Sequence, residues 1–322
     1  MKMKVALNLL PVILLLVFTL QSCQKELSPE TTTAPTTPTT PDSNYIAKIY
    51  TIEVVNGVAD TGYIMTYYYD NLKRVVSIFD SAKNLYNYTQ SKYNYFYINN
   101  DSLPYKSTVY SVNAYYPTQT VFYYDTTITY HFYDNAGKNL KDSIIFSTYR
   151  VLSTFSYFSI LELRDYSYGT GKIYGHKTFF PIVNNSGAMF YPQKDTAIVN
   201  ASGNIIDYKN YEFNPSSSLF ELSATSIFTY DAKPSPFSKL SNFKTFGVFP
   251  SGETLFYELP QYNNRLTQNE HHSFLGGGSG VYYNTTFSNS YNANGLVKEM
   301  LIYDVPPDPA NFVKVTFVYK SL

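Results

Sequence analysis

Near the end of the chain, residues 312–319 read Phe-Val-Lys-Val-Thr-Phe-Val-Tyr. Val313, Val315, Phe317 and Tyr319 occupy every second position, and the positions between them are mixed. Successive side chains of a strand point to opposite faces, so this alternation predicts an antiparallel strand with one buried face.

Similar runs recur along the chain, and tyrosine is the residue that dominates them. The sequence has 35 Tyr and 23 Phe but no Trp, and aromatic residues suit the pleated, half-buried surface of a sheet. No stretch of helical length has a persuasive apolar stripe with a 3.6-residue period, although a short helix over Lys239–Phe246 is compatible with the pattern. The further predicted strands are Tyr63–Tyr69, Tyr93–Ile98, Val121–Tyr124, Ile144–Tyr149 and Phe155–Leu163.

One turn motif separates several of these strands. It begins with Asp or Asn, whose side chain can bond the turn backbone, and ends three positions later with Gly, which accepts a left-handed conformation. Asp70–Lys73 resembles a fourth copy with Lys in place of Gly, and Asp231–Pro234 resembles a fifth with an altered turn. The three full copies are Asp134–Gly137, Asn200–Gly203 and Asn292–Gly295, so Gly137, Gly203 and Gly295 are the predicted left-handed positions.

These features predict an all-β domain: a large antiparallel meander of long hairpins, strongly curved or closed into a barrel-like sheet. A membrane-spanning barrel would confine its aromatic residues to two interfacial girdles. Here tyrosines run through the strands, and the chain ends at Leu322 without a terminal aromatic residue. We therefore favour a water-soluble sheet over a membrane-spanning barrel.

The N-terminal residues have the pattern of a secretory signal. Lys2 and Lys4 supply positive charge, and an apolar run from Val5 to Leu20 follows. Leu20-Gln21-Ser22-Cys23 resembles the bacterial lipobox, which implies cleavage after residue 22 and acylation of Cys23. Cys23 is the single cysteine, so a disulfide framework is excluded. The alternative is a buried cysteine behind an ordinary signal peptide.

A tether and a single folded domain are predicted to follow the anchor. Residues 28–44 are rich in Thr and Pro and offer no apolar group to bury, so residues 23–44 are interpreted as the lipid anchor with a disordered tether. The β domain is predicted over residues 45–322. Gln24-Lys25-Glu26 resembles the signal that directs Bacteroidetes-type lipoproteins to the outer face of the outer membrane. The periplasmic face and an ordinary solvated charge pair remain open alternatives.

The turn-bearing units carry a family resemblance. Tyr133-Asp134, Tyr291-Asn292, residues 228–237 and residues 295–300 resemble Bacteroidetes lipoproteins with YD-repeat-like sequences. The resemblance covers most of residues 45–322. It implies the porin-like fold described for that family, whose function is unknown, and it implies no chemistry.

No enzyme, metal or cofactor signature is found in the sequence. The cluster Glu270-His271-His272 lacks the third and fourth ligands that a zinc site needs, and neighbouring residues on a strand face opposite ways. We therefore interpret these residues as polar residues of a loop. Residues 276–280 read Gly-Gly-Gly-Ser-Gly and lack the residues of a nucleophile elbow or a phosphate loop, so we expect a flexible hairpin tip. Lys and Arg balance Asp and Glu at 24 each, which gives no field to attract nucleic acid.

Five Asp-Ser/Thr-aliphatic triplets resemble the acceptor for O-glycosylation in exported Bacteroidetes proteins. The alternative reading is that Asp-Ser and Asp-Thr begin turns, and both readings remain open. The candidate acceptors are Ser81, Ser102, Thr126, Ser143 and Thr196.

The sequence leaves three classes of function. The first is a lipid-anchored, non-catalytic binding or adhesion module, held on the outer membrane by its acyl chains, that presents aromatic residues to a glycan or another envelope protein. The second is a structural or accessory outer-membrane lipoprotein without a small-molecule ligand. The third, a hydrolase of envelope polymers, lacks a recognisable site.

Overall fold

The computed structural model describes residues 44–83, 87–115, 118, 120–150, 156–184, 190–240, 262–274, 278–304, 307 and 309–322. The predicted signal peptide, Cys23 and the tether up to residue 43 lie outside the described residues. The predictions about them therefore stay predictions.

The described part of the chain consists almost entirely of antiparallel strands, with one short 3-10 helix. The helix η1 is Pro236–Lys239. The strands are β1 (Tyr45–Val55), β2 (Val58–Tyr69), β3 (Val75–Lys83), β4 (Asn87–Phe96), β5 (Lys106–Tyr115), β6 (Thr120–Tyr133), β7 (Asn139–Arg150), β8 (Ser156–Gly169), β9 (Lys172–Asn184), β10 (Gln193–Val199), β11 (Ile205–Asn214), β12 (Leu219–Pro234), β13 (Asn263–Phe274), β14 (Gly278–Tyr291), β15 (Val297–Asp304) and β16 (Phe312–Lys320).

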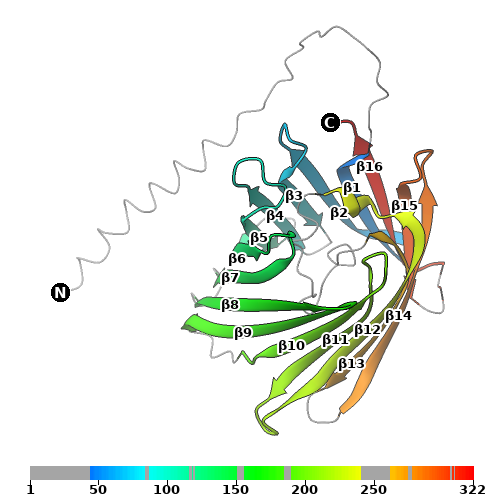
Figure 1. The fold of residues 1–322 in the computed structure, drawn as a ribbon. Coiled ribbons are helices and arrows are strands. Elements are labelled where there is room, and N and C mark those ends of the chain that lie inside the picture. Colours follow the sequence, from blue (N-terminus) through cyan, green and yellow to red (C-terminus); the bar gives the residue numbers. More distant parts are fainter. Residues whose placement is uncertain are drawn as a thin grey trace. The chain divides into compact units, whose positions relative to one another are not determined.

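The strands form one closed barrel in chain order (Figure 1). Each strand pairs with its neighbours in sequence, and β1 closes the barrel by pairing with β16, with Ile49 opposite Phe317. The prediction of an all-β, barrel-like antiparallel sheet is confirmed. No helix in the described ranges is long and apolar enough to cross a membrane.

The local predictions agree with the strands and differ at one predicted turn. Each predicted strand lies within, or overlaps, an observed strand. Of the helix expected over Lys239–Phe246, only Lys239, the last residue of η1, and Leu240 are described. Residues 241–246 lie outside the described residues, so this prediction stays a prediction. Asp231–Pro234 is not a turn, because β12 continues through Pro234.

The Asx turns share one geometry and one end of the barrel. Gly137, Gly203 and Gly295 have φ of 74°, 86° and 76°, and in each turn the Gly N–H donates to the carbonyl of the first residue. Lys73 closes the fourth copy with φ 61°, although it carries a Cβ. The turns join β2 to β3, β6 to β7, β10 to β11 and β14 to β15. Even-to-odd connections of an antiparallel meander all lie at the same end, which we call the Asx-turn end.

The tyrosines of the Tyr-Asp pairs bond the backbone of a preceding segment of the chain, which explains these pairs physically. The Tyr69 hydroxyl donates to the Ile46 carbonyl (2.8 Å), Tyr133 to Pro104 (3.0 Å) and Tyr230 to Ile205 (2.7 Å). In each pair, the tyrosine bonds the backbone of the preceding strand or connection, and the aspartate that follows it accepts backbone N–H groups. Tyr97, Tyr168 and Tyr319 donate to backbone carbonyls in the same way.

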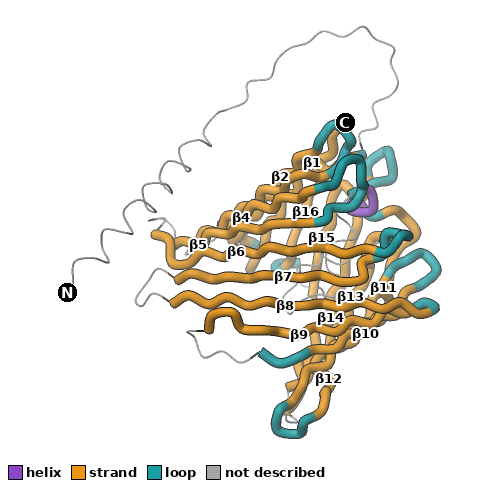
Figure 2. The backbone as a smooth tube through the Cα atoms, turned by 60° about the vertical axis from the view of Figure 1, so that its left-hand side comes forward, coloured by secondary structure: helices purple, strands orange, loops and turns teal. Residues whose placement is uncertain are grey.

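Alternate residues of the strands face inward and outward, and one side of the interior is apolar. In β2, Met65 and Tyr67 are buried, whereas Tyr68 is exposed. The apolar cluster extends over β1–β4 and β14–β16 and includes Ile49, Ile78 and Val315. The helix η1 adds Phe237, whose ring packs edge-on against Phe317 at 5.9 Å. Figure 2 shows η1 in purple. The inner faces of β5–β11 carry buried charged and polar groups beside a smaller apolar cluster that includes Tyr166, Ile205 and Tyr208.

Candidate functional site

The strongest candidate site is a pocket on the inner face of β5–β8, at the end opposite the Asx turns. Its volume is about 490 Å³, which lies in the range of pockets for small ligands. The register of the sheet brings the residues that line the pocket side by side. Tyr123 pairs with Arg150, and Thr148 pairs with both Asp125 and Phe158. The lining residues are Tyr115, Phe122, Tyr123, Asp125, Phe146, Thr148, Arg150 and Phe158.

Aromatic rings form most of the pocket wall. Phe122 is central, with its ring centroid 4.7 Å from that of Tyr115 and 4.8 Å from that of Tyr123. Phe146 and Phe158 form a second tilted pair at 5.6 Å. Rings that are fixed by neighbouring rings offer flat apolar surfaces at small entropic cost. The wall can therefore stack against a flat ligand face.

A few polar groups lie among these rings. Thr148 Oγ1 donates to Asp125 Oδ1 at 2.6 Å. Burial raises the pKa of Asp125, and the bond from Thr148 and the charge of Arg150 only partly offset this effect. Burial and the Asp125 charge also raise the pKa of Tyr123. The pocket thus combines aromatic surfaces with an acid, a hydroxyl and a guanidinium that can orient a polar ligand.

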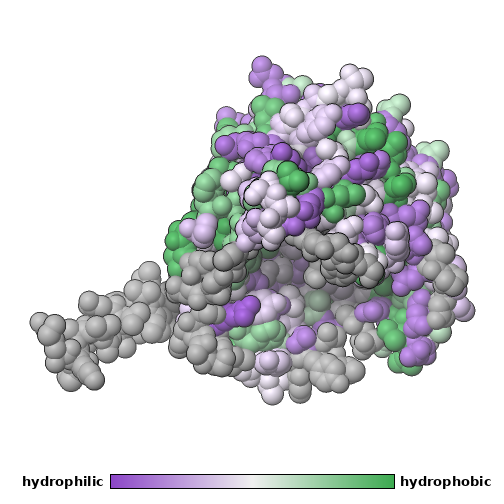
Figure 3. Space-filling model, turned by 90° about the horizontal axis from the view of Figure 1, so that it is seen from below, coloured by the Kyte–Doolittle hydropathy of each residue, from purple (hydrophilic) through white to green (hydrophobic). Residues whose placement is uncertain are grey.

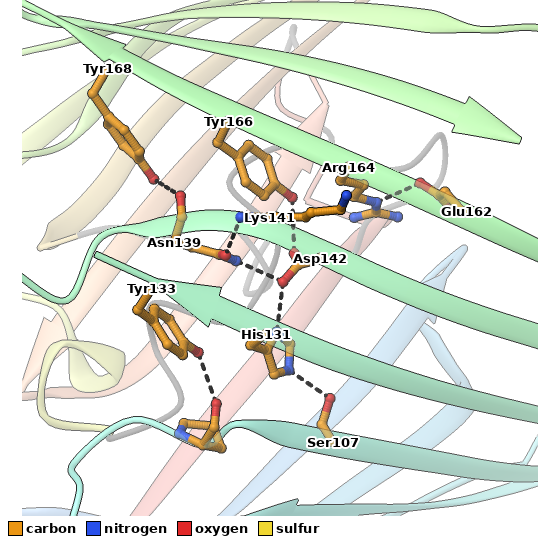
Figure 4. Close-up of polar contacts among 11 residues, drawn as sticks. Ser107, His131, Tyr133, Asn139, Lys141, Asp142, Glu162, Arg164, Tyr166 and Tyr168 are labelled. Atoms are coloured by element: carbon orange, nitrogen blue, oxygen red, sulfur yellow. Dashed lines mark hydrogen bonds and ion pairs between the residues drawn. The ribbon is translucent and has the colours of Figure 1, made fainter. Parts of the chain in front are cut away.

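Strands β6–β8, which contribute to the pocket, are also joined by a buried polar network (Figure 4). Asp142 of β7 is 2% exposed. Its Oδ1 lies 2.8 Å from His131 Nδ1 and accepts a bond of 2.8 Å from Asn139 Nδ2, while its Oδ2 accepts from the Tyr166 hydroxyl at 3.1 Å. These contacts connect β6, β7 and β8. The network therefore fixes the spacing of strands that also build the pocket.

The network contains a serine, a histidine and an aspartate in the bonding order of a nucleophilic triad. Ser107 Oγ lies 3.0 Å from His131 Nε2, and Asp142 holds the other ring nitrogen. Acyl transfer also needs donors aimed at the developing oxyanion, often a backbone N–H beside the nucleophile at a sharp turn. Ser107 instead lies within β5 and is paired with β4 and β6. The arrangement favours a structural role for these bonds.

Two further ion pairs extend the network around the inner face. Arg164 Nε lies 2.5 Å from Glu162 Oε1. Burial is the largest single effect and lowers the pKa of Arg164, but Glu162, Tyr166 and Asp142 together outweigh it, so the pKa is raised. Lys177 Nζ lies 3.4 Å from Asp195 Oδ2. Burial lowers the pKa of Lys177, and Asp195 partly counters that effect. Tyr208 also donates to Asp195 at 2.6 Å.

The Asp-Ser/Thr triplets occupy positions that sequence reasoning missed. Asp80, Asp125, Asp142 and Asp195 lie mid-strand on the inner face, and their neighbours Ser81, Thr126, Ser143 and Thr196 lie on the outer face. For these four triplets, the reading as turn starts is wrong. Ser102 alone is in an exposed connection between strands. The signal that could have located them is an aspartate in the middle of a predicted strand, at one of the alternate positions that face inward.

The other candidates from sequence do not meet in one site. Glu270, His271 and His272 lie within β13 rather than in a loop, because the strand extends to Phe274. His271 stacks against Tyr282 at 4.2 Å, and His272 packs edge-on against Tyr283. In the described ranges, no group of three His, Cys, Asp or Glu residues is placed to hold a metal ion. The glycine-rich connection between β13 and β14 lies partly outside the described residues.

Comparison with known proteins identifies the fold. A crystal structure of a porin-like protein from Bacteroides vulgatus ATCC 8482 matches 86% of this chain and 99% of its own, with a TM-score of 0.50 and 7% identity. A porin-like protein from Bacteroides uniformis ATCC 8492 matches 85% of this chain and 96% of its own at 11% identity, with a TM-score of 0.31. No family model and no curated protein matches the sequence. The first of these matches, with its TM-score of 0.50, shows that the chain has a porin-like fold.

Proposed function

We propose that this protein is a non-catalytic, lipid-anchored binding module of the cell envelope that takes a glycan into the aromatic pocket of β5–β8. The observation that carries the proposal is the pocket itself: paired rings beside Asp125, Thr148 and Arg150. The apolar face of a sugar ring stacks on aromatic surfaces, and its hydroxyls need donors and acceptors at the rim. The porin-like fold and the lipobox resemblance of Cys23 support the envelope location.

The outer face supports a barrel that stays in water. Lys92 and Lys209 project outward from the middle of β4 and β11, and an outward pair joins Lys314 to Glu299 at 2.5 Å. A lysine facing lipid at the midplane of a bilayer costs about 2 to 4 kcal/mol. Figure 3 shows hydrophilic and hydrophobic residues intermixed over the described part of this view. In this proposal, attachment to the outer membrane comes from the acyl chains on Cys23.

Fractionation tests the anchor. Cys23→Ser should move the protein from the membrane to the soluble fraction, because the lysines that face outward from the middle of β4 and β11 oppose contact with lipid tails. A barrel inserted in the membrane would stay in the membrane fraction without its acyl chains, and that result would defeat this part of the proposal.

Ligand binding is tested by thermal unfolding in the presence of envelope and dietary polysaccharides. A ligand selective for the native state adds about 2.7 kcal/mol of stability at a hundred times its Kd. Phe122→Ala and Arg150→Ala should reduce the shift in Tm. Tyr282→Ala is the matched control, because Tyr282 is 72% exposed on β14, away from the pocket.

Two results would refute the glycan proposal. The first is the absence of any shift in Tm across the panel, which would leave the accessory lipoprotein without a small-molecule ligand as the better account. The second is labelling of Ser107 by a fluorophosphonate probe, lost in His131→Ala, which would show that the Ser107–His131–Asp142 chain acts as a nucleophile and that the protein is an enzyme.

A further inference from the structure

A second, separate feature of the interior is an incompletely paired buried cation. Arg265 of β13 is 1% exposed and is the largest fully buried side chain of the described residues. Its Nη1 donates to Gln268 Oε1 at 2.5 Å. The guanidinium carbon lies 4.6 Å from the ring centroid of Phe228 and 5.7 Å from that of Phe287. These contacts stabilise part of the charge.

The remaining donors of Arg265 form an unused fork. Nε and Nη2 have no hydrogen-bond partner among the residues that the structure describes. These two nitrogens lie on one edge of the planar guanidinium, and their N–H groups are parallel. That edge matches the two oxygens of a carboxylate, which accepts both bonds at once. A buried donor without an acceptor is costly, so an empty fork is an unfavourable state.

Glu270, the acidic group whose charge acts on Arg265, is engaged elsewhere. Glu270 Oε1 accepts from Ser226 Oγ at 3.1 Å, and Oε2 lies 3.6 Å from His272 Nε2. Burial lowers the pKa of Arg265, with smaller opposing effects from Tyr230 and Glu270, but a guanidinium stays charged in proteins. The charge therefore lacks a close anionic partner in the described part of the interior.

Asn289 supplies an independent sign of a missing ligand. Its Nδ2 donates to the Arg265 carbonyl at 3.0 Å, which places the side chain beside Arg265. Its Oδ1 is buried and has no partner among the described residues. Asn289 therefore leaves one buried acceptor unused on a side chain that bonds the Arg265 backbone. A hydroxy acid carries a carboxylate for the Arg265 fork and a hydroxyl that donates to such an acceptor.

We propose that the inner face of β12–β14 binds a small carboxylate, which the Nε–Nη2 edge of Arg265 holds between the Phe228 and Phe287 rings. The site is distinct from the pocket of β5–β8 and does not depend on the proposed glycan function. Arg265 is opposite Tyr230 in the register, near the Asx-turn end, whereas that pocket is at the other end.

The experiment is a titration of the purified protein with sodium acetate, benzoate and glycolate, followed by calorimetry and by Tm. Sodium chloride at equal ionic strength and benzyl alcohol are the controls for salt and for an uncharged ring. We expect saturable binding of at least one carboxylate and of neither control. Arg265→Lys should weaken binding about ten-fold or more, because an ammonium cannot form the bidentate pair.

Arg74→Lys is the matched control variant, because Arg74 is already paired with Asp70 at 2.7 Å and lies in a turn. It should bind as the wild type does. If Arg265→Lys fails to fold, Phe228→Leu and Asn289→Ala test the same site and should each weaken binding. Failure of the wild type to bind any of the three carboxylates would overturn the proposal, as would equal binding by the wild type and the folded variants.

Discussion

Removal of the Asp142 carboxylate should severely destabilise the barrel. In Asp142→Ala, His131 Nδ1, Asn139 Nδ2 and the Tyr166 hydroxyl lose the acceptor that now lies 2.8, 2.8 and 3.1 Å away. A hydrogen bond to a charged group contributes about 1.5 to 3 kcal/mol, but neighbouring bonds are not additive. Loss of one partner of a buried pair costs about 3 to 5 kcal/mol, and we expect a decrease of that size.

Urea unfolding, followed by far-UV circular dichroism and tyrosine fluorescence, measures this decrease if both signals change together. Asp142→Asn should cost less, because the amide oxygen still accepts one of the three bonds. Asp165→Asn is the matched control: Asp165 faces outward, 3.8 Å from Lys141, and the Asp165 side chain is 57% exposed, so the change should stay within about 0.5 kcal/mol. An Asp142→Ala variant as stable as the wild type would refute the view that this network holds β6–β8 together.

Three further predictions concern turns and buried ionisable groups. Gly295→Val should lower the free energy of unfolding in urea by about 1 to 3 kcal/mol because of its positive φ alone. Gly203→Val should lower it more, since a Cβ there would lie 2.7 Å from the Tyr262 ring. Equal stability of both variants and the wild type would contradict the turn geometry. Burial raises the pKa of interior tyrosines, to about 12 for Tyr168, so their contribution to stability is complete below pH 10 and is lost above it. Absorbance at 295 nm should then show a cooperative step that coincides with loss of circular dichroism, and not a single reversible titration near pH 10 with the barrel intact. Burial also raises the pKa of Asp80; the native state then holds its proton to higher pH than the unfolded state, so the free energy of unfolding should fall as the pH rises through that interval, and Asp80→Asn should flatten the profile measured between pH 3.5 and 7.

Sequence patterns determined the local structure well because the forces involved act over a few residues. Alternation in residues 312–319 predicted β16, since burial of one face is recorded directly in a two-residue period. Asp134 and Gly137 predicted a tight turn because one supplies an acceptor and the other a left-handed backbone. The same reasoning failed at Asp231. Its Oδ1 accepts the local bond from the Lys233 N–H, but the chain does not reverse there: β12 continues to Pro234, and the register with β13 shifts between Tyr230 and Pro234.

The candidate site was decided by tertiary structure. Nothing in the sequence near Asp142 specifies that His131 and Tyr166 come from the strands on either side, because lateral neighbours depend on the register of separate hairpins. Barrel closure decides which face of every strand is enclosed. It turns the Asp142-Ser143 pair, which the sequence offered as a glycosylation acceptor or the start of a turn, into a buried acid with an outward hydroxyl. The sequence alone therefore determined the strands, the turns and the predicted location of the protein in the cell envelope. The closed sheet determined which charged groups are buried together and where a ligand can enter.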